Sequence, residues 1–211
     1  MSDQSKTEKR QSRDAAMGEF LEAAGIERRV TDSALEVDAV LQQWRRRANK
    51  RELGTAALRA FGLGAEIDLA QLDVLIAIWA PSREFASCDA DETMVSTIAS
   101  RLGIDPSRAS RLVSELISKG LARRAVSQQD ARRTIVELTA RGHAIVHAVR
   151  RFKFLVMGDF LSDWTQEELD TFVPLLERFV QWADEAQSVG PDRFASEIAE
   201  ISAELARKSA S

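Results

Sequence analysis

The sequence predicts a mainly α-helical protein that carries one small β-hairpin. Apolar residues recur at spacings of three and four along most of the chain, which is the period of a helix buried on one face. Residues that start and end helices bracket these periodic segments. Convincing strands occur only at 121–125 and 134–138, and the polar loop between them predicts a single hairpin.

The composition excludes several classes of protein. The 211 residues, 45% of them hydrophobic, suit one compact domain or two small ones that share a core. One cysteine rules out an internal disulfide, and one cysteine with two histidines cannot supply a zinc site of four such ligands. The chain lacks a glycine-rich phosphate loop, a G-x-S-x-G motif and a metal-spaced cluster, so we expect neither an enzyme nor a bound cofactor.

The first part of the chain predicts a polar arm followed by helices. No run approaches the roughly 18 apolar residues of a membrane span, and residues 1–14 are polar where a signal peptide turns apolar. We therefore expect a cytoplasmic protein with a mobile arm. A short helix is expected near 17–24, and a long one over 32–61 that Gly54 could interrupt. The buried stripe of the long helix is predicted to be Val37, Val40, Leu41, Trp44 and Ala48.

Two shorter helices follow. Asp68 and Gln71 form a capping box at the start of a helix over 69–79, which Pro81 stops. An exposed loop over 81–92 leads to a helix over 94–102, which ends at Gly103. The buried residues of that second helix are predicted to be Val95, Ile98, Ala99 and Leu102.

The next helix has an emphatic start signal. Asp105 can accept free backbone N–H groups, and Pro106 suits the first helical position. The helix runs to about Ser118, and Gly120 ends it. Its buried stripe is Ala109, Leu112, Val113 and Leu116, which leaves Ser107, Arg108, Ser110, Arg111, Ser114 and Ser118 on the other faces.

Three helices are predicted after the hairpin. Thr139 caps a long helix over 140–161. Thr165 and Glu168 form another capping box, which starts a helix that runs to about residue 186. A last amphipathic helix covers about 192–208.

Charges are separated along the chain, although the formal total is only -4. Residues 101–133 carry eight basic groups and three acids, whereas residues 155–211 carry twelve acids and four bases. The basic set is Arg101, Arg108, Arg111, Lys119, Arg123, Arg124, Arg132 and Arg133. Such separation lets an acidic protein present one anion-attracting surface, although a run of charges can also be an ordinary solvated face.

The order of elements from 94 to 138 is that of a winged helix-turn-helix. Small Ala99 permits two helices to cross closely, which holds the helix over 106–118 outward. Serine hydroxyls and arginine guanidinium groups suit guanine edges or phosphates in a major groove, and the helix N-terminus would offer unpaired N–H groups to a phosphate. The alternative is an ordinary surface helix.

The hairpin loop carries Asp130, Arg132 and Arg133 at the tip of a projecting ribbon. Such a tip can enter a narrow minor groove, where the negative potential is enhanced. The Asp130 carboxylate is expected to orient the arginines by a charge-assisted bond. Lys119 and Arg124 complete the expected DNA-binding set, and the alternative is a solvated loop.

Two segments, IASRLGIDPSRASRLVSELISKGLARR and QDARRTIVELTARG, resemble the MarR family of bacterial ligand-responsive transcriptional regulators. The resemblance covers about 33–186, and its most specific part is the D-x-R of Asp130 and Arg132 leading into Leu138, Thr139 and Gly142. It implies a homodimeric winged helix-turn-helix protein that reads a pseudo-palindromic operator in double-stranded DNA. Residues implied for the major groove are Ser107, Arg108, Ser110, Arg111 and Ser114, and Arg132 is implied for the minor groove.

The same resemblance implies a division of the chain and a small organic effector. After the arm over 1–14, the N-terminal dimerisation helices would occupy 15–63, the DNA-binding domain 64–141 and the C-terminal dimerisation helices 142–211. The protein would be a repressor released by a small, often aromatic ligand. Candidate ligand-binding residues are Trp44, Arg45, Trp79, His143 and His147, although tryptophans are more often core and such histidines more often solvated.

Three other functions stay open at this point. The chain could be a sequence-nonspecific architectural protein that uses the same basic face, or a helix-turn-helix that contacts only an acidic protein partner. It could also be a redox-sensing regulator that acts through Cys88. The nearby acids Asp89, Asp91 and Glu92 argue against that last function, because their charges discourage formation of the thiolate.

Overall fold

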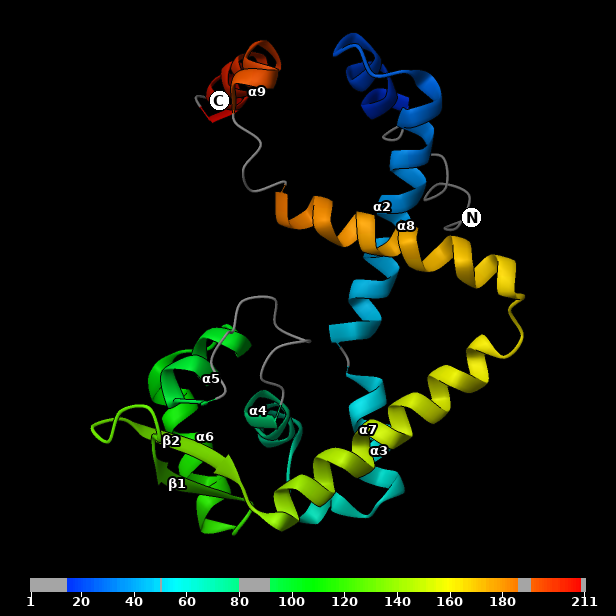
Figure 1. Ribbon diagram of the computed structural model, residues 1–211. Helices are drawn as coiled ribbons and strands as arrows, with labels where there is room; N and C mark the ends of the chain where they lie inside the picture. Colours follow the sequence, from blue (N-terminus) through cyan, green and yellow to red (C-terminus); the bar gives the residue numbers. More distant parts are fainter. Residues whose placement is uncertain (1–14, 50, 80–91, 186–190, 210–211) are drawn as a thin grey trace, which may run out of the picture. The chain divides into compact units, whose positions relative to one another are not determined.

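The computed structural model describes residues 15–49, 51–79, 92–185 and 191–209. The expectations for the arm over 1–14, for Pro81 and for Cys88 lie outside these residues. The chain forms two compact units, one of Met1–Arg47 with Trp164–Ser211 and the other of Ala48–Asp163 (Figure 1). In the described part of the chain, no helix is both long enough and apolar enough to cross a bilayer.

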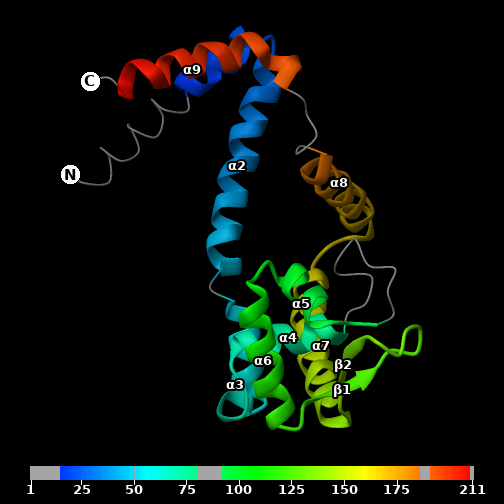
Figure 2. The same cartoon turned by 90° about the vertical axis from the view of Figure 1, so that its left-hand side faces the viewer.

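The unit of Ala48–Asp163 contains the helix-turn-helix and the hairpin (Figures 1 and 2). Its elements are α3 (Glu52–Ala60), η1 (Leu63–Ala65), α4 (Leu69–Trp79), α5 (Val95–Leu102), α6 (Pro106–Ser118), β1 (Ala122–Val126), β2 (Thr134–Leu138) and α7 (Ala140–Leu161). The two strands pair antiparallel. The predicted fold class, mainly helical with a small hairpin wing, is therefore confirmed.

The core of this unit lies where α3, α4, α5, α6, α7 and the hairpin meet. Fully buried side chains of these elements include Val74, Leu75, Ile98, Val113 and Leu116, and Leu121 just before β1 is also fully buried. The predicted apolar stripe of α6 is buried as a whole, because Ala109, Leu112, Val113 and Leu116 all face this core. Burial of the stripe fixes which face of α6 is left outside.

Most of the predicted helix boundaries hold, because they depend on contacts between near neighbours. The Asp68 carboxylate accepts a bond from the backbone N–H of Gln71 at 2.8 Å, and the Gln71 side chain accepts one in return from Asp68 N at 3.3 Å. Gly103 ends α5 with a φ of 60°, a left-handed conformation that glycine adopts without strain. Thr139 caps α7 by accepting a bond from Gly142 N at 3.2 Å.

The hairpin pairs in a register one residue later than predicted, and a backbone bond ties it to the segment before α5. Ala122 lies opposite Leu138 and Val126 opposite Thr134, so β1 is shifted by one residue from its predicted range. At the free edge of β2, Val136 N donates to Thr93 O at 2.7 Å. This bond makes the segment before α5 part of the support of the wing.

The junction between the hairpin and α7 requires a glycine. A Cβ atom placed on Gly142 would lie 2.1 Å from the backbone oxygen of Leu121, far inside contact distance. Thr139 reinforces the junction, since its N–H donates to Leu121 O at 3.1 Å and its hydroxyl to Gly120 O at 2.7 Å. The start of α7 therefore holds the start of the wing.

The second unit contains the helices outside this body. It comprises a helix over 15–23, most of α2 (Arg28–Asn49), α8 (Gln166–Glu185), η3 (Pro191–Phe194) and α9 (Ala195–Ser209). The predicted capping box of α8 is present, because Thr165 N donates to Glu168 at 2.7 Å and Glu168 N donates to the Thr165 hydroxyl at 3.2 Å. The last predicted helix begins with a short 3-10 turn and becomes α-helical at Ala195.

The prediction of one long helix over 32–61 is wrong. The segment forms α2 and α3, and Arg51 stands before α3 with a φ of 52°. A left-handed arginine leaves no signal in the sequence, whereas Gly54 lies inside α3, where a Cβ would approach Leu69 to 3.1 Å. The predicted buried stripe is also wrong for the single chain, because Val40 is 65% exposed and Trp44 68% exposed.

Candidate nucleic-acid interface

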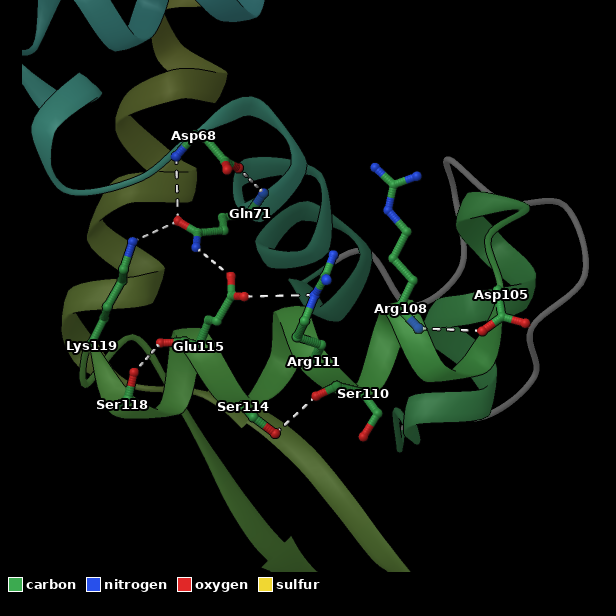
Figure 3. Close-up of polar contacts among 10 residues, drawn as sticks. All are labelled: Asp68, Gln71, Asp105, Arg108, Ser110, Arg111, Ser114, Glu115, Ser118 and Lys119. Carbon is green, nitrogen blue, oxygen red and sulfur yellow. Dashed lines mark hydrogen bonds and ion pairs between the residues drawn. The ribbon is translucent and has the colours of Figure 1, made fainter.

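Helix α6 presents a polar face to solvent directly opposite its buried stripe. Ser107, Arg108, Ser110, Arg111 and Ser114, the five residues predicted to reach the major groove, are all exposed. The stripe that packs inward fixes this orientation. Figure 3 shows Arg108, Ser110, Arg111 and Ser114 along the same helix. The arrangement gives one helix face that carries hydroxyl and guanidinium groups and no large apolar side chain.

The N-terminus of α6 is closed by its own cap. The Asp105 carboxylate accepts bonds from Ser107 N at 2.8 Å and Arg108 N at 3.4 Å, and it also accepts the Ser107 hydroxyl. Ala109 N donates to Asp105 O at 3.0 Å. The expectation that this terminus offers unpaired N–H groups to a phosphate is therefore wrong, because the cap uses them. The Ser107 hydroxyl and backbone bonds hold the pKa of Asp105 below its usual range.

The cations on and after α6 differ in how firmly they are held. The structure gives the Arg108 guanidinium no bond or ion pair to another described residue. Arg111 Nε lies 3.8 Å from Glu115 Oε1, in an ion pair whose arginine side chain is 70% exposed. Lys119 is engaged with the protein, since its ammonium donates to Glu66 O at 2.6 Å and to Gln71 Oε1 at 2.7 Å. Arg101 points inward and donates to Ala77 O at 2.6 Å.

The wing loop extends beyond the helices of its unit in both views (Figures 1 and 2). Its tip is closed by two backbone bonds, Ser127 N to Arg133 O at 3.0 Å and Arg133 N to Asp130 O at 2.8 Å. Asp130 accepts Arg132 N at 3.0 Å and lies 3.5 Å from Arg133 Nε. The carboxylate thus orders the tip through the backbone of one arginine and the guanidinium of the other.

Two basic side chains of the wing are open to solvent. Arg132 and Arg124 are exposed, and neither guanidinium has a bond or ion pair to a described residue. Arg123, in contrast, pairs across the strands with Glu137 at 2.8 Å. The wing therefore keeps Arg132 available at its tip while Arg123 serves the hairpin itself.

Glu92 supports the wing from outside the hairpin and was not predicted. Its carboxylate accepts the hydroxyl of buried Ser127 and the backbone N–H of Gln128, the latter at 2.6 Å. The Ser127 bond is the main reason why the pKa of Glu92 lies below its usual value, and the Gln128 N–H adds to it. The partners are 35 and 36 residues apart, so local sequence patterns carry no signal for this contact.

The predicted ligand residues divide between the two units. Trp79 at the end of α4 is half-buried, and its ring centroid lies 5.9 Å from that of His147 on α7. The ring of His143 stacks on that of His147, with 6.2 Å between the ring centroids. The Arg150 guanidinium, which was not predicted, lies 4.8 Å from the Trp79 ring centroid. Trp44 and Arg45 are exposed on α2. Among the described residues, no group of three or more His, Cys, Asp or Glu could hold a metal ion.

Comparison of the sequence with protein families and with curated proteins gives two matches. The model of the MarR family matches residues 90–133, which include α5, α6 and β1. A protein of Bacillus subtilis (strain 168) described as the uncharacterized HTH-type transcriptional regulator YdgJ is 29% identical over 89 residues. That match covers 42% of this chain and 54% of the relative, so it spans about half of the relative's length.

Solved structures give the same fold. A MarR family protein from Bacillus stearothermophilus is similar with a TM-score of 0.58 at 18% identity, covering 72% of this chain and 96% of that one. Streptococcus pneumoniae FabT, solved in complex with DNA, is similar with a TM-score of 0.54 at 17% identity, covering 70% and 98%. The resemblance to the MarR family that the sequence motifs predict is therefore confirmed, both in the sequence around the helix-turn-helix and in the fold.

Proposed function

We propose that this chain is a transcriptional regulator that binds double-stranded DNA with sequence specificity. One observation carries the proposal: α6 turns five serines and arginines to solvent, and the loop of the wing in the same unit carries exposed Arg132. A helix of this kind fits a major groove, and a cationic ribbon tip fits the neighbouring minor groove. Similarity to a FabT structure in complex with DNA supports the proposal.

The protein would act as a homodimer. Large apolar side chains are exposed along α2, the second half of α7, α8 and α9, including Trp44, Leu155, Trp182 and Leu205. Leu155 is 73% exposed and Leu205 63% exposed. A soluble monomer rarely exposes so many large apolar side chains to this extent. A second copy of the chain would cover these faces and give the two recognition helices of a pseudo-palindromic operator.

The finer function we propose is repression that a small organic ligand relieves. The group of Trp79, His143, His147 and Arg150 supports an aromatic, anionic ligand, because it combines ring faces with a guanidinium. Trp44 and Arg45 remain candidates for the same role. Ligand binding would lower DNA affinity by favouring a conformation in which the two recognition helices no longer match successive major grooves. Such a regulator would work in the cytoplasm.

Selection of duplexes from a random pool tests the proposal. The recovered duplex should be a pseudo-palindrome with half-sites about 10 base pairs apart. In a gel shift at fixed salt, it should bind roughly a thousandfold or more tightly than random duplex. Equal affinity for selected and random DNA would favour an architectural protein, and no binding to either would leave only the protein-contact function.

A further inference from the structure

Glu115 is an acidic residue on the otherwise basic surface of α6. Residues 101–133 contain three acids, and two of them have evident roles, because Asp105 caps α6 and Asp130 orders the wing tip. A negative charge beside a DNA-binding face weakens the general attraction for phosphates. We therefore expect Glu115 to favour DNA binding in another way that offsets its repulsion of phosphates.

The two oxygens of Glu115 have different partners, as Figure 3 shows. Oε2 accepts a bond of 2.8 Å from Nε2 of Gln71 on α4, and Oε1 lies 3.8 Å from Nε of Arg111, one turn earlier on α6. Glu115 is 41% exposed in its side chain, whereas Gln71 is only 5% exposed. The three residues form a chain of contacts from the interior to the exposed guanidinium.

Gln71 is itself firmly anchored. Its Oε1 accepts bonds from Lys119 Nζ at 2.7 Å and from Asp68 N at 3.3 Å. An amide that gives its NH₂ to a carboxylate and its oxygen to an ammonium has one favourable orientation, so these partners fix the flip of the side chain. Gln71 can therefore hold the Glu115 carboxylate in place while Glu115 positions Arg111.

The contact with Glu115 can orient the Arg111 side chain without binding it so tightly that it cannot reach DNA. At 3.8 Å it is an ion pair longer than a hydrogen bond, and such exposed pairs are weak. The recorded ion pair is made by Nε, and neither terminal NH₂ group of Arg111 has a hydrogen bond to a described residue, so both can donate to a guanine edge. An arginine that already points the right way loses less side-chain freedom when it binds.

We propose that Gln71 and Glu115 are positioning residues that aim Arg111 at one base pair and so determine specificity at that position. The inference rests on the proposed DNA-binding function. If Glu115 only stabilised the fold, its replacement would change the affinity for random DNA and the preference for one base pair together. If Glu115 positions Arg111, its replacement changes these two quantities separately.

The first test measures Arg111 in the free protein. NMR relaxation of its Nε–Hε group should show a lower order parameter in Glu115→Gln than in the wild type. Glu137→Gln is the matched control, because it removes the same charge from an arginine ion pair in the hairpin. An unchanged order parameter in Glu115→Gln would overturn the proposal without any DNA measurement.

The second test uses the duplex selected by the wild-type protein, with every base pair of one half-site changed in turn, and random duplex at the same salt concentration. Glu115→Gln should bind random duplex more tightly, while discrimination at one position falls roughly five- to tenfold. Glu137→Gln should keep that discrimination. Gln71→Ala should lose it without the gain in random binding, and thermal unfolding checks that each variant is folded.

A double variant identifies the residue through which Glu115 acts. If the effect passes through Arg111, adding Glu115→Gln to Arg111→Ala should change discrimination at that base pair no further. A further loss in the Arg111→Ala background would overturn the proposal. A wild-type protein that prefers no duplex would overturn both the DNA-binding function and this inference, whereas a wild-type preference that Glu115→Gln leaves intact would overturn the inference alone.

Discussion

Replacement of Gly142 by alanine should destabilise the protein and displace the wing. The new Cβ would lie 2.1 Å from Leu121 O, so α7 or the start of the hairpin must move by at least about 0.9 Å to reach the shortest contacts seen in proteins. Because the obstacle is backbone, the strain cannot be relieved by a rotamer change. Overpacking of this kind costs roughly 1–3 kcal/mol, and here we expect the upper end.

The helix propensity of alanine opposes this cost by at most about 1 kcal/mol, since glycine is less favourable than alanine by that amount in a helix. The net loss is then about 2 kcal/mol in the free energy of unfolding, measured by urea denaturation. Gly158→Ala in the same helix is the matched control, because nothing lies within 4 Å of its added Cβ, and it should stabilise by up to about 1 kcal/mol. Equal stability of the two variants would refute the close approach of Leu121 and α7.

Four further predictions concern the wing and the helix pair. Arg132→Ala should leave thermal stability unchanged and lower the slope of log affinity against log salt by about one for each wing; an unchanged slope would remove the wing from the interface. Asp105→Ala should cost about 1 kcal/mol in urea denaturation, whereas Asp105→Asn should retain most of the stability, and equal losses would argue against a capping role. Because the pKa of Glu92 lies below its ordinary value of 4.5, the Glu92 carboxylate stabilises the fold above pH 4.5, and this stabilisation is lost as the pH falls through the depressed pKa. The stabilities of the wild type and Glu92→Gln, measured by acid unfolding, should therefore converge at low pH. A stability difference that stays constant with pH would contradict the role of the Glu92 charge. Ala99→Leu should cost roughly 1–3 kcal/mol and weaken DNA binding by separating α5 from α6, and a fully stable, fully binding variant would contradict their close packing.

Local signals predicted much of the helix-turn-helix and its boundaries. Asp105, Thr139 and the pair of Asp68 and Gln71 act on backbone groups two or three residues away, so the printed sequence contains the whole interaction. The buried stripe of α6 follows from spacing alone, since a helix repeats every 3.6 residues. The sequence alone therefore assigns the exposed serines and arginines of α6 to one face.

Longer-range contacts could not be predicted in this way. The sequence places Lys119 in the DNA-binding set, yet two of its three N–H donors are used by Glu66 and Gln71, which are 53 and 48 residues away. Glu92 braces the wing through Ser127, and Gln71 reaches Glu115 across 44 residues. In each case the folded core brings the partners together, and the residue types alone do not specify the pairing.

The predicted burial of the apolar stripe of α2 is wrong for a different reason. Val40 and Trp44 follow the helical period of a buried face, but the period records that a face is apolar and not what covers it. A homodimer would reconcile the pattern with the exposure. Analytical ultracentrifugation should then give a dimer at micromolar concentration.

The central claim is that the exposed face of α6 and the tip of the wing contact one DNA duplex together. Backbone amide NMR spectra of the protein, recorded with and without the selected duplex, test it most directly. The largest chemical-shift changes should fall on residues 107–114 and 130–133, with random duplex producing smaller changes at the same places. Changes confined to α8 and α9, with both of these segments unaffected, would contradict the account.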